Sequence, residues 1–301
     1  MSTIYTHILF FKKATLTILS LLLFGFTSFA QWSSIASQTG GVGNDGAVSF
    51  TIDGNGYTLA GSSTNKVYMY DTLADTWTVV DTVPVDMGHA FAMSFTVGGR
   101  VFIVGGDTSG VPVSTVWEYT PNGRGHFLQK QDFPAGPRDA GFGFGLDGYG
   151  YVGAGNDNVS LFGDIWKYDP LHDAWTHLSD SLLPEVLIFP TSFVVGHKAY
   201  ILTGGTAPTG VNEVMDMWAF DGTTMTQKAS YPGAGRQAAF TFSNNGYGYV
   251  GGGQANYTTN YNDMWRYDAA NDQWSAAPGS PLLGGAWSST FVVGNNAYAG
   301  L

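Results

Sequence analysis

The chain has 301 residues, no cysteine, 23 acidic against 12 basic side chains and a formal net charge of −11. This acidic balance argues against nucleic acid or an anionic membrane surface as a partner, and without cysteine the stability of the chain has to come from packing rather than from disulfides. The 42 glycines, 16 tyrosines, 20 phenylalanines and 9 tryptophans are spread evenly, which favours an all-β protein with many tight turns.

Residues 1–30 have the pattern of a secretory signal peptide. Two lysines precede the apolar run 14–26, and small residues at its end fit cleavage after Ala30. A run of this length is shorter than the roughly 20 residues that a membrane-spanning helix needs. We therefore expect a mature domain from Gln31 to Leu301 that is secreted, periplasmic or attached to the cell surface, with no membrane insertion after cleavage. Removal of the two lysines leaves 10 basic against 23 acidic residues.

The stretch Arg138–Trp175 contains four strand signals within one unit. Two runs of small and aromatic residues are joined by Asp147-Gly148, a pair that suits a tight hairpin turn. After a Gly-Ala-Gly break and a polar loop, two further runs show the alternation of a strand. The four predicted strands cover residues 141–146, 149–152, 164–168 and 175–178. We expect them to form one small antiparallel sheet.

This unit repeats along the chain. A glycine doublet, or an Ala-Gly or Gly-Ala pair in its place, closes the second strand of every unit, at intervals of 45, 48, 51, 47 and 48 residues. An aromatic-x-Tyr-Asp run, or a close variant, marks the third strand. The fourth strand begins with Trp77, Trp175 and Trp274 in units one, three and five only, which are 98 and 99 residues apart. The larger period is therefore a pair of units, and an even number of units is expected.

A period near 50 residues with a glycine doublet, an aromatic-x-Tyr-Asp run and a Trp resembles the kelch repeat of the galactose oxidase-like propellers, in its exported bacterial form. The resemblance covers residues 31–301 and implies an exported, all-β kelch-type β-propeller whose units are four-stranded blades. Blades of this kind bury their two apolar faces against one another around an axis. Six blades are expected rather than seven. The last blade is incomplete, because Ala286–Leu301 supplies two strands; Gln31–Ser37 is expected to supply the outer strand, and the chain to be truncated at its C-terminus.

Variable loops distinguish the two faces of such a propeller. The loops before the first strand and after the second share one face, here called the long-loop face, and differ in length and sequence in every unit. The residues that precede the first strands reach this face near the axis: Asn44, His89, Arg138, Leu187, Arg236 and Gly285. Two guanidinium groups in this ring suit carboxylate, sulfate or sugar hydroxyls, or else bond to neighbouring blades. Gln254 and Tyr257, with Asn256 and Tyr261 beside them, suit stacking on a sugar ring.

The candidate pocket is therefore His89, Arg138, Arg236, Asn44, Gln254 and Tyr257, and neither a cofactor nor a metal is expected. A copper oxidase is disfavoured because its crosslink needs a cysteine, and the mature histidines do not converge on one place. We expect a monomeric, non-catalytic module that binds a glycan or an extracellular protein. The alternatives are a carbohydrate-active enzyme of the sialic acid epimerase type, with Glu213 or Asp107 as the acid or base, and a passive module of a larger surface protein.

Overall fold

The computed structural model describes residues 32–38, 45–121, 126–207, 212–281 and 286–300. The predicted signal peptide, Gln31, Asn44, Gly285 and Leu301 lie outside these described residues. Residues 34–301 form one compact unit. The described part of the chain contains β-strands and no helix, so it has no helix long and apolar enough to cross a membrane.

Five antiparallel sheets of four strands follow one another along the chain, each with its first strand innermost. The first two sheets contain β1 (Val48–Ile52), β2 (Asn55–Leu59), β3 (Lys66–Asp71) and β4 (Thr76–Thr82), then β5 (Met93–Val97), β6 (Arg100–Val104), β9 (Val116–Thr120) and β10 (His126–Gln129). The third and fourth contain β11 (Phe142–Leu146), β12 (Tyr149–Gly153), β13 (Ile165–Asp169) and β14 (Ala174–Ser179), then β15 (Thr191–Val195), β16 (Lys198–Leu202), β17 (Met217–Phe220) and β18 (Met225–Lys228). The fifth contains β19 (Phe240–Asn244), β20 (Tyr247–Gly251), β23 (Met264–Asp268) and β24 (Gln273–Ala277).

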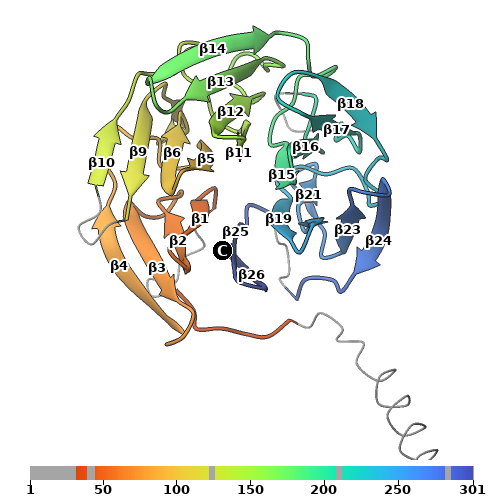
Figure 1. Ribbon diagram of the computed structural model, residues 1–301, viewed down its shortest axis with the longest axis horizontal. Coiled ribbons are helices and arrows are strands. Elements are labelled where there is room, and N and C mark those ends of the chain that lie inside the picture. The colour runs from red at the N-terminus through yellow and green to blue at the C-terminus, as the bar shows by residue number, and fades with distance from the viewer. Residues whose placement is uncertain (1–31, 39–44, 122–125, 208–211, 282–285, 301) are drawn as a thin grey trace, which may run out of the picture. The chain divides into compact units, whose positions relative to one another are not determined.

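A smaller, two-stranded sheet of β25 (Ser289–Val293) and β26 (Asn296–Gly300) follows the five. The innermost strands contact one another in the order β1, β5, β11, β15, β19 and β25, and β25 contacts β1 again (Figure 1). The all-β propeller predicted from the repeat is therefore confirmed. The prediction of six four-stranded blades is confirmed only in part, because the described residues form five such blades, and β25–β26 lies between the fifth and the first.

Side-chain hydroxyls join neighbouring inner strands around the axis. Ser192 Oγ donates to the carbonyl oxygen of Gly143, Thr241 Oγ1 to that of Ser192, and Thr290 Oγ1 to that of Thr241. Ser49 Oγ then donates to the carbonyl oxygen of Thr290 at 2.7 Å. Buried carbonyl groups that would otherwise lack a partner are satisfied in this way between strands of different sheets.

The pairwise period of the sequence has a packing cause. Phe291, Phe95 and Phe193, on the inner strands of the even units, pack against glycines in the second strands of units one, three and five. A Cβ atom on Gly56 would lie 2.0 Å from the ring of Phe291, and the equivalent distances from Gly150 to Phe95 and from Gly248 to Phe193 are both 2.1 Å. The glycines of the Gly-Tyr pairs in the odd units are therefore required by the phenylalanines of the even units.

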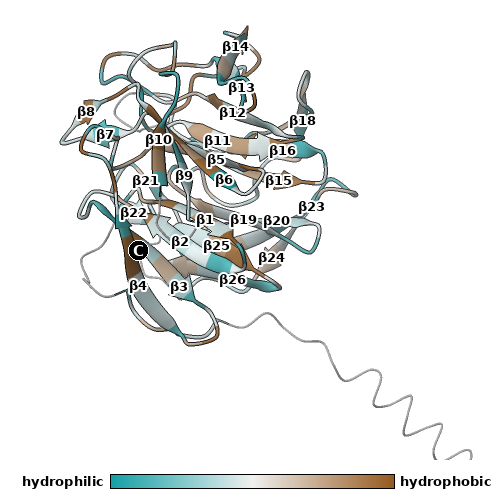
Figure 2. Cartoon of the chain, turned by 60° about the vertical axis from the view of Figure 1, so that its left-hand side comes forward, coloured by the Kyte–Doolittle hydropathy of each residue, from teal (hydrophilic) through white to brown (hydrophobic). Residues whose placement is uncertain are grey.

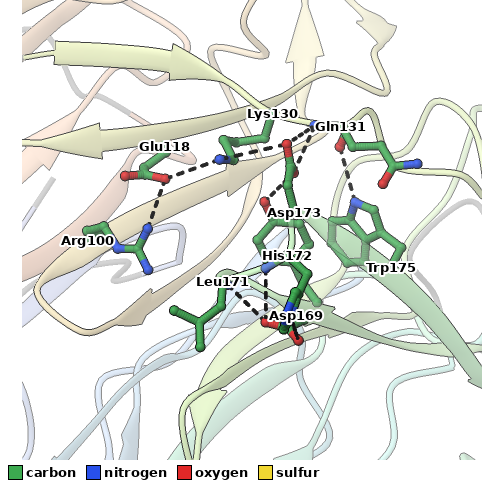
Figure 3. Close-up of polar contacts among 10 residues, drawn as sticks. Arg100, Glu118, Lys130, Gln131, Asp169, Leu171, His172, Asp173 and Trp175 are labelled. Atoms are coloured by element: carbon green, nitrogen blue, oxygen red, sulfur yellow. Dashed lines mark hydrogen bonds and ion pairs between the residues drawn. The ribbon is translucent and has the colours of Figure 1, made fainter.

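A second odd–even interaction joins the outer strands (Figure 3). Asp173, in the turn between β13 and β14, accepts hydrogen bonds from the buried Tyr168 hydroxyl at 2.6 Å and from the backbone N–H of Gln131 at 3.1 Å. The indole of Trp175 donates to the carbonyl oxygen of the same Gln131 at 3.2 Å. Lys130 lies between Asp173 and Glu118 and forms an ion pair with each. This Tyr-Asp-Trp clip fastens the third blade to the end of the outer strand of the second.

The clip recurs at the two equivalent places. In the fifth blade Asp272 accepts from the N–H of Ala229, whose carbonyl oxygen accepts from Trp274. In the first blade Asp75 and Trp77 bind the N–H and the carbonyl oxygen of Ala36 in the same way. Ala36 therefore occupies the position that follows an outer strand elsewhere. Residues 32–38 nevertheless form no strand, so the outer strand predicted at 31–37 is not present in the described part.

Candidate functional site

Two small hairpins extend the loops on the long-loop face. They are β7 (Asp107–Thr108) with β8 (Val111–Pro112), and β21 (Gln254–Ala255) with β22 (Thr259–Asn260). Both lie on the same side of the ring of blades (Figure 2). The loop of the third unit is an irregular polar turn in which Asp157 accepts hydrogen bonds from the backbone N–H groups of Val159 and Ser160. The loops predicted to vary therefore do differ in structure, above blades that closely resemble one another.

A ring of residues closes the axis where the inner strands begin. Its members have a left-handed backbone with φ between 51° and 70°. Each but the first donates its backbone N–H to the carbonyl oxygen of the member before it, over 2.8 to 3.1 Å. The ring consists of Gly46, Phe91, Ala140, Phe189, Ala238 and Trp287. Its three aromatic members pack edge to face, with ring centroids 4.2 to 5.4 Å apart. A cavity of about 240 Å³ lies along the first halves of the inner strands below them.

The two arginines of the predicted pocket are buried rather than presented to the surface. Arg138 is 1% exposed and forms an ion pair with Asp164, and its guanidinium lies 3.8 Å from the ring of Phe162. Arg236 is 0% exposed, pairs with Asp263 at 2.7 Å and donates to the carbonyl oxygen of Gly252 at 2.7 Å. In this arrangement both guanidinium groups hold a blade together, and the charge of each is paired within that blade.

The partner aspartates were not singled out from the sequence. Asp164 and Asp263 each precede the third strand by one residue, and each accepts the indole N–H of a tryptophan two residues later. Burial favours a higher pKa for Asp263, but the hydrogen bonds and charge of Arg236 outweigh it, and the pKa lies below its ordinary value. The signal was present in the sequence, because only units three and five combine an arginine before the first strand with an Asp-x-Trp at the third.

The other members of the predicted ring lie in different surroundings. His89 is partly buried, and its Nε2 atom makes no hydrogen bond with the described residues. Leu187 is buried. Gln254 is 7% exposed, and its backbone N–H and carbonyl pair with those of Gln237. Among the described residues no three histidine, aspartate or glutamate side chains are placed to hold a metal ion.

A polar cluster that the sequence did not single out lies one residue further along the inner strands. Asp139 is 6% exposed and accepts a hydrogen bond from the side-chain amide of Asn156. Burial and then the nearby charge of Asp107 raise its pKa from 3.8 to about 6. Gln237 is 0% exposed, and neither atom of its side-chain amide makes a well-formed hydrogen bond with the described residues. A buried amide with no better partner among the described residues than the Tyr257 hydroxyl is unusual, because buried polar groups are normally satisfied.

Tyr257 connects this cluster with the loops. Its phenol lies beside the Gln237 amide and close enough to Glu213 and Asp139 for their charges to raise its pKa, although burial is the larger cause. Among the aromatic side chains of the described residues, Tyr257 is the exposed one, at 45%. Glu213 in turn accepts a hydrogen bond from the backbone N–H of Asn256. Polar groups of units two to five therefore meet around one exposed aromatic ring. We call Asp107, Asp139, Glu213, Gln237 and Tyr257 the axial polar cluster.

The fold and this geometry define a β-propeller with a polar cluster near the axis on its long-loop face. Among solved structures, the chain is similar to the one titled "Structure of YjhT", with a TM-score of 0.72 and 17% sequence identity over 86% of this chain and 90% of that chain. At this identity the likeness concerns the fold. No protein-family model matches the sequence, and no curated protein matches it.

Proposed function

We propose that this propeller is a non-catalytic binding module that takes a glycan at the axial polar cluster of its long-loop face. The observation that carries the proposal is the buried Gln237 amide beside the exposed ring of Tyr257: with the described residues the amide has at most a weak hydrogen bond, to the Tyr257 hydroxyl. A sugar offers hydroxyl groups that both donate and accept, which an amide can pair with, and an apolar ring face that an aromatic side chain can cover.

A glycan array probed with the purified mature protein tests this proposal. We expect binding to a defined set of glycans, and a loss of at least about tenfold in affinity for Tyr257→Ala. Leu171→Ala is the matched control, because Leu171 is 83% exposed in the turn between β13 and β14 on the opposite face. An extracellular protein is the other partner that the sequence suggests. Binding to a protein ligand but to no glycan would favour the extracellular protein as the partner. An equal loss of affinity in Tyr257→Ala and Leu171→Ala would contradict the proposed site.

A carbohydrate-active enzyme is the second candidate, favoured by one specific observation. Asp139 has a pKa raised to about 6, which suits proton transfer near neutral pH, and it lies beside Asp107, one of the two carboxylates suggested by the sequence. An enzyme of the sialic acid epimerase type would change the NMR spectrum of a candidate sugar with time, and Asp139→Asn would abolish the change. A spectrum that stays constant while the sugar binds would leave the binding module as the function.

We further propose that the propeller has six blades of the kelch type, the sixth built around β25–β26 and joined to the first blade near Ala36. The recurrence of the clip at Ala36 supports this, since its equivalents Gln131 and Ala229 follow the outer strands β10 and β18. Export with removal of residues 1–30 fits the same arrangement. Intact mass of the protein from its native host tests the export, with an N-terminus at Gln31 expected and a retained Met1 contradicting it.

A further inference from the structure

We infer that the axial polar cluster selects uncharged sugars and rejects sugars that carry a carboxylate or sulfate. This inference rests on the proposed function and deepens it, because it names the class of glycan that the site takes. It depends on where the charges of the long-loop face lie and on which of them are already paired.

The two arginines that precede inner strands are already paired with carboxylates inside the blades. Arg138 and Arg236 are 1% and 0% exposed, and each is neutralised by an aspartate of its own blade. Breaking either pair to receive an anionic ligand would leave an aspartate without its partner, which is strongly unfavourable for the buried Asp164. The recognition of an acidic sugar by an arginine is therefore not open to this arrangement.

The members of the axial polar cluster are neutral or acidic. Asp107 lies close enough to Asp139 for its charge to raise the Asp139 pKa, and Glu213 acts in the same direction on Tyr257. A carboxylate placed against Tyr257 would meet these like charges in a partly desolvated site, and like-charge juxtaposition opposes binding. The formal net charge of −11 adds repulsion of the same sign at longer range.

The neutral groups of the cluster offer the hydrogen-bond donors and acceptors that sugar hydroxyls need. The Gln237 amide supplies two N–H donors and an acceptor, and the phenol of Tyr257 can both donate and accept. Asp107 and Glu213 accept hydrogen bonds from hydroxyl groups when ionised. A neutral sugar ring over Tyr257 would thus offer hydroxyl groups to this cluster without introducing a charge.

Protonation of Asp139 should modulate this selection, because its negative charge is lost as the pH falls through about 6. The titratable groups that face Asp139 or Tyr257 are Asp107 and Glu213, and His89 lies on the neighbouring blade with its Nε2 atom unpartnered. Rejection of an acidic sugar is therefore expected to be stronger at pH 8 than at pH 5.

Calorimetric titration with matched sugars tests the inference. The probes are neutral gluco- and galacto-oligosaccharides and the corresponding uronic acids, titrated at pH 8 and pH 5 into the wild type, Asp107→Asn and Glu213→Gln. We expect the neutral sugar to bind at least about tenfold more tightly than its acidic counterpart at pH 8, and both variants to narrow that ratio. His89→Gln is the control for the pH arm, because histidine also changes charge between pH 5 and 8.

The possible failures can be told apart. Tighter or equal binding of the uronic acids at pH 8 would overturn the inference and leave the proposed glycan function standing. Absence of binding by every sugar, neutral and acidic, would overturn the proposed function and the inference together. A preference for neutral sugars that Asp107→Asn and Glu213→Gln leave unchanged would show that these carboxylates do not cause it, and would also overturn the inference.

Discussion

Ser49 Oγ donates a hydrogen bond to the carbonyl oxygen of Thr290 over 2.7 Å, across a sequence separation of 241 residues. Thr51 repeats the contact two residues later with the carbonyl oxygen of Val292. These bonds join β1 to β25 with the same hydroxyl-to-carbonyl geometry that Thr241 and Ser192 use within the chain. The ring of inner strands is therefore closed through β25, although the sheet that β25 belongs to has only two strands in the described part.

Closure through β25 predicts that Gly56→Ala destabilises the protein by about 1–3 kcal/mol, because the new methyl group would overlap the ring of Phe291. Gly150→Ala, whose methyl group would overlap Phe95 between the second and third blades, should lower the stability by a similar amount. Urea unfolding measures both. Gly163→Ala is the control, since its Cβ would be in ordinary contact at 3.4 Å and should change the stability by less than about 0.5 kcal/mol. A stable Gly56→Ala beside an unstable Gly150→Ala would mean that the ring is open at β25.

The buried ion pairs predict an unequal effect of removing one partner or both. Asp164→Asn leaves the Arg138 guanidinium buried at 1% exposure without its counter-charge, and we expect a loss of about 3 kcal/mol or more. The double variant Arg138→Met with Asp164→Leu removes both charges and should recover most of that loss. Thermal unfolding of the single and double variants provides the comparison. A double variant that loses as much stability as Asp164→Asn, or more, would contradict the structural role assigned to this pair.

The Tyr-Asp-Trp clip predicts a coupling between its members. Asp173→Ala leaves the hydroxyl of the buried Tyr168 without an acceptor and releases the N–H of Gln131, which should cost about 1–3 kcal/mol. Tyr168→Phe alone should cost less, and adding it to Asp173→Ala should cost little more. A double-mutant cycle from denaturant unfolding gives the coupling energy. A value near zero would show that the clip does not act as a unit.

Asp139 predicts a definite sign for the pH dependence of stability. Its pKa is about 6 in the folded protein against an ordinary 3.8, so its contribution is fully present below pH 3.8 and is lost as the pH rises through about 6. Unfolding temperatures between pH 4 and pH 7 should therefore decline less with rising pH in Asp139→Asn than in the wild type. If the unfolding temperature changed equally with pH in both proteins, Asp139 would have its ordinary pKa in the folded state, which would contradict this prediction.

Much of the fold could be predicted from the sequence, because each feature has a local cause. The four strands of Arg138–Trp175 appear within one or two residues of their predicted positions, since Asp147-Gly148 and the Gly-Ala-Gly break fix the turns. The pair period is also real, and its cause is the contact between an even-unit phenylalanine and an odd-unit glycine such as Gly150. The mutual dependence of Phe95 and Gly150 is a contact between blades, which no reading of a single unit supplies.

The site was less predictable, because burial decides the role of a polar residue and burial is a tertiary property. Arg138 and Arg236 lie at the positions the repeat gives them, but their side chains turn into the blades towards Asp164 and Asp263. The adjacent residues Asp139 and Gln237 form the axial polar cluster instead, and Tyr257, which the sequence did single out, joins them. Whether this cluster takes the glycan stays a prediction.

Replacement of Gln237 by leucine is the most direct test of that prediction. The change removes both amide atoms at nearly constant volume, and because those atoms make no well-formed hydrogen bond with the described residues, the free energy of unfolding should not fall. Titration calorimetry with a neutral glycan selected on the array, together with urea unfolding, measures both properties. We predict a stability equal to or above that of the wild type and an affinity at least about tenfold lower. Unchanged affinity in a folded Gln237→Leu protein would contradict the assignment of glycan binding to this cluster.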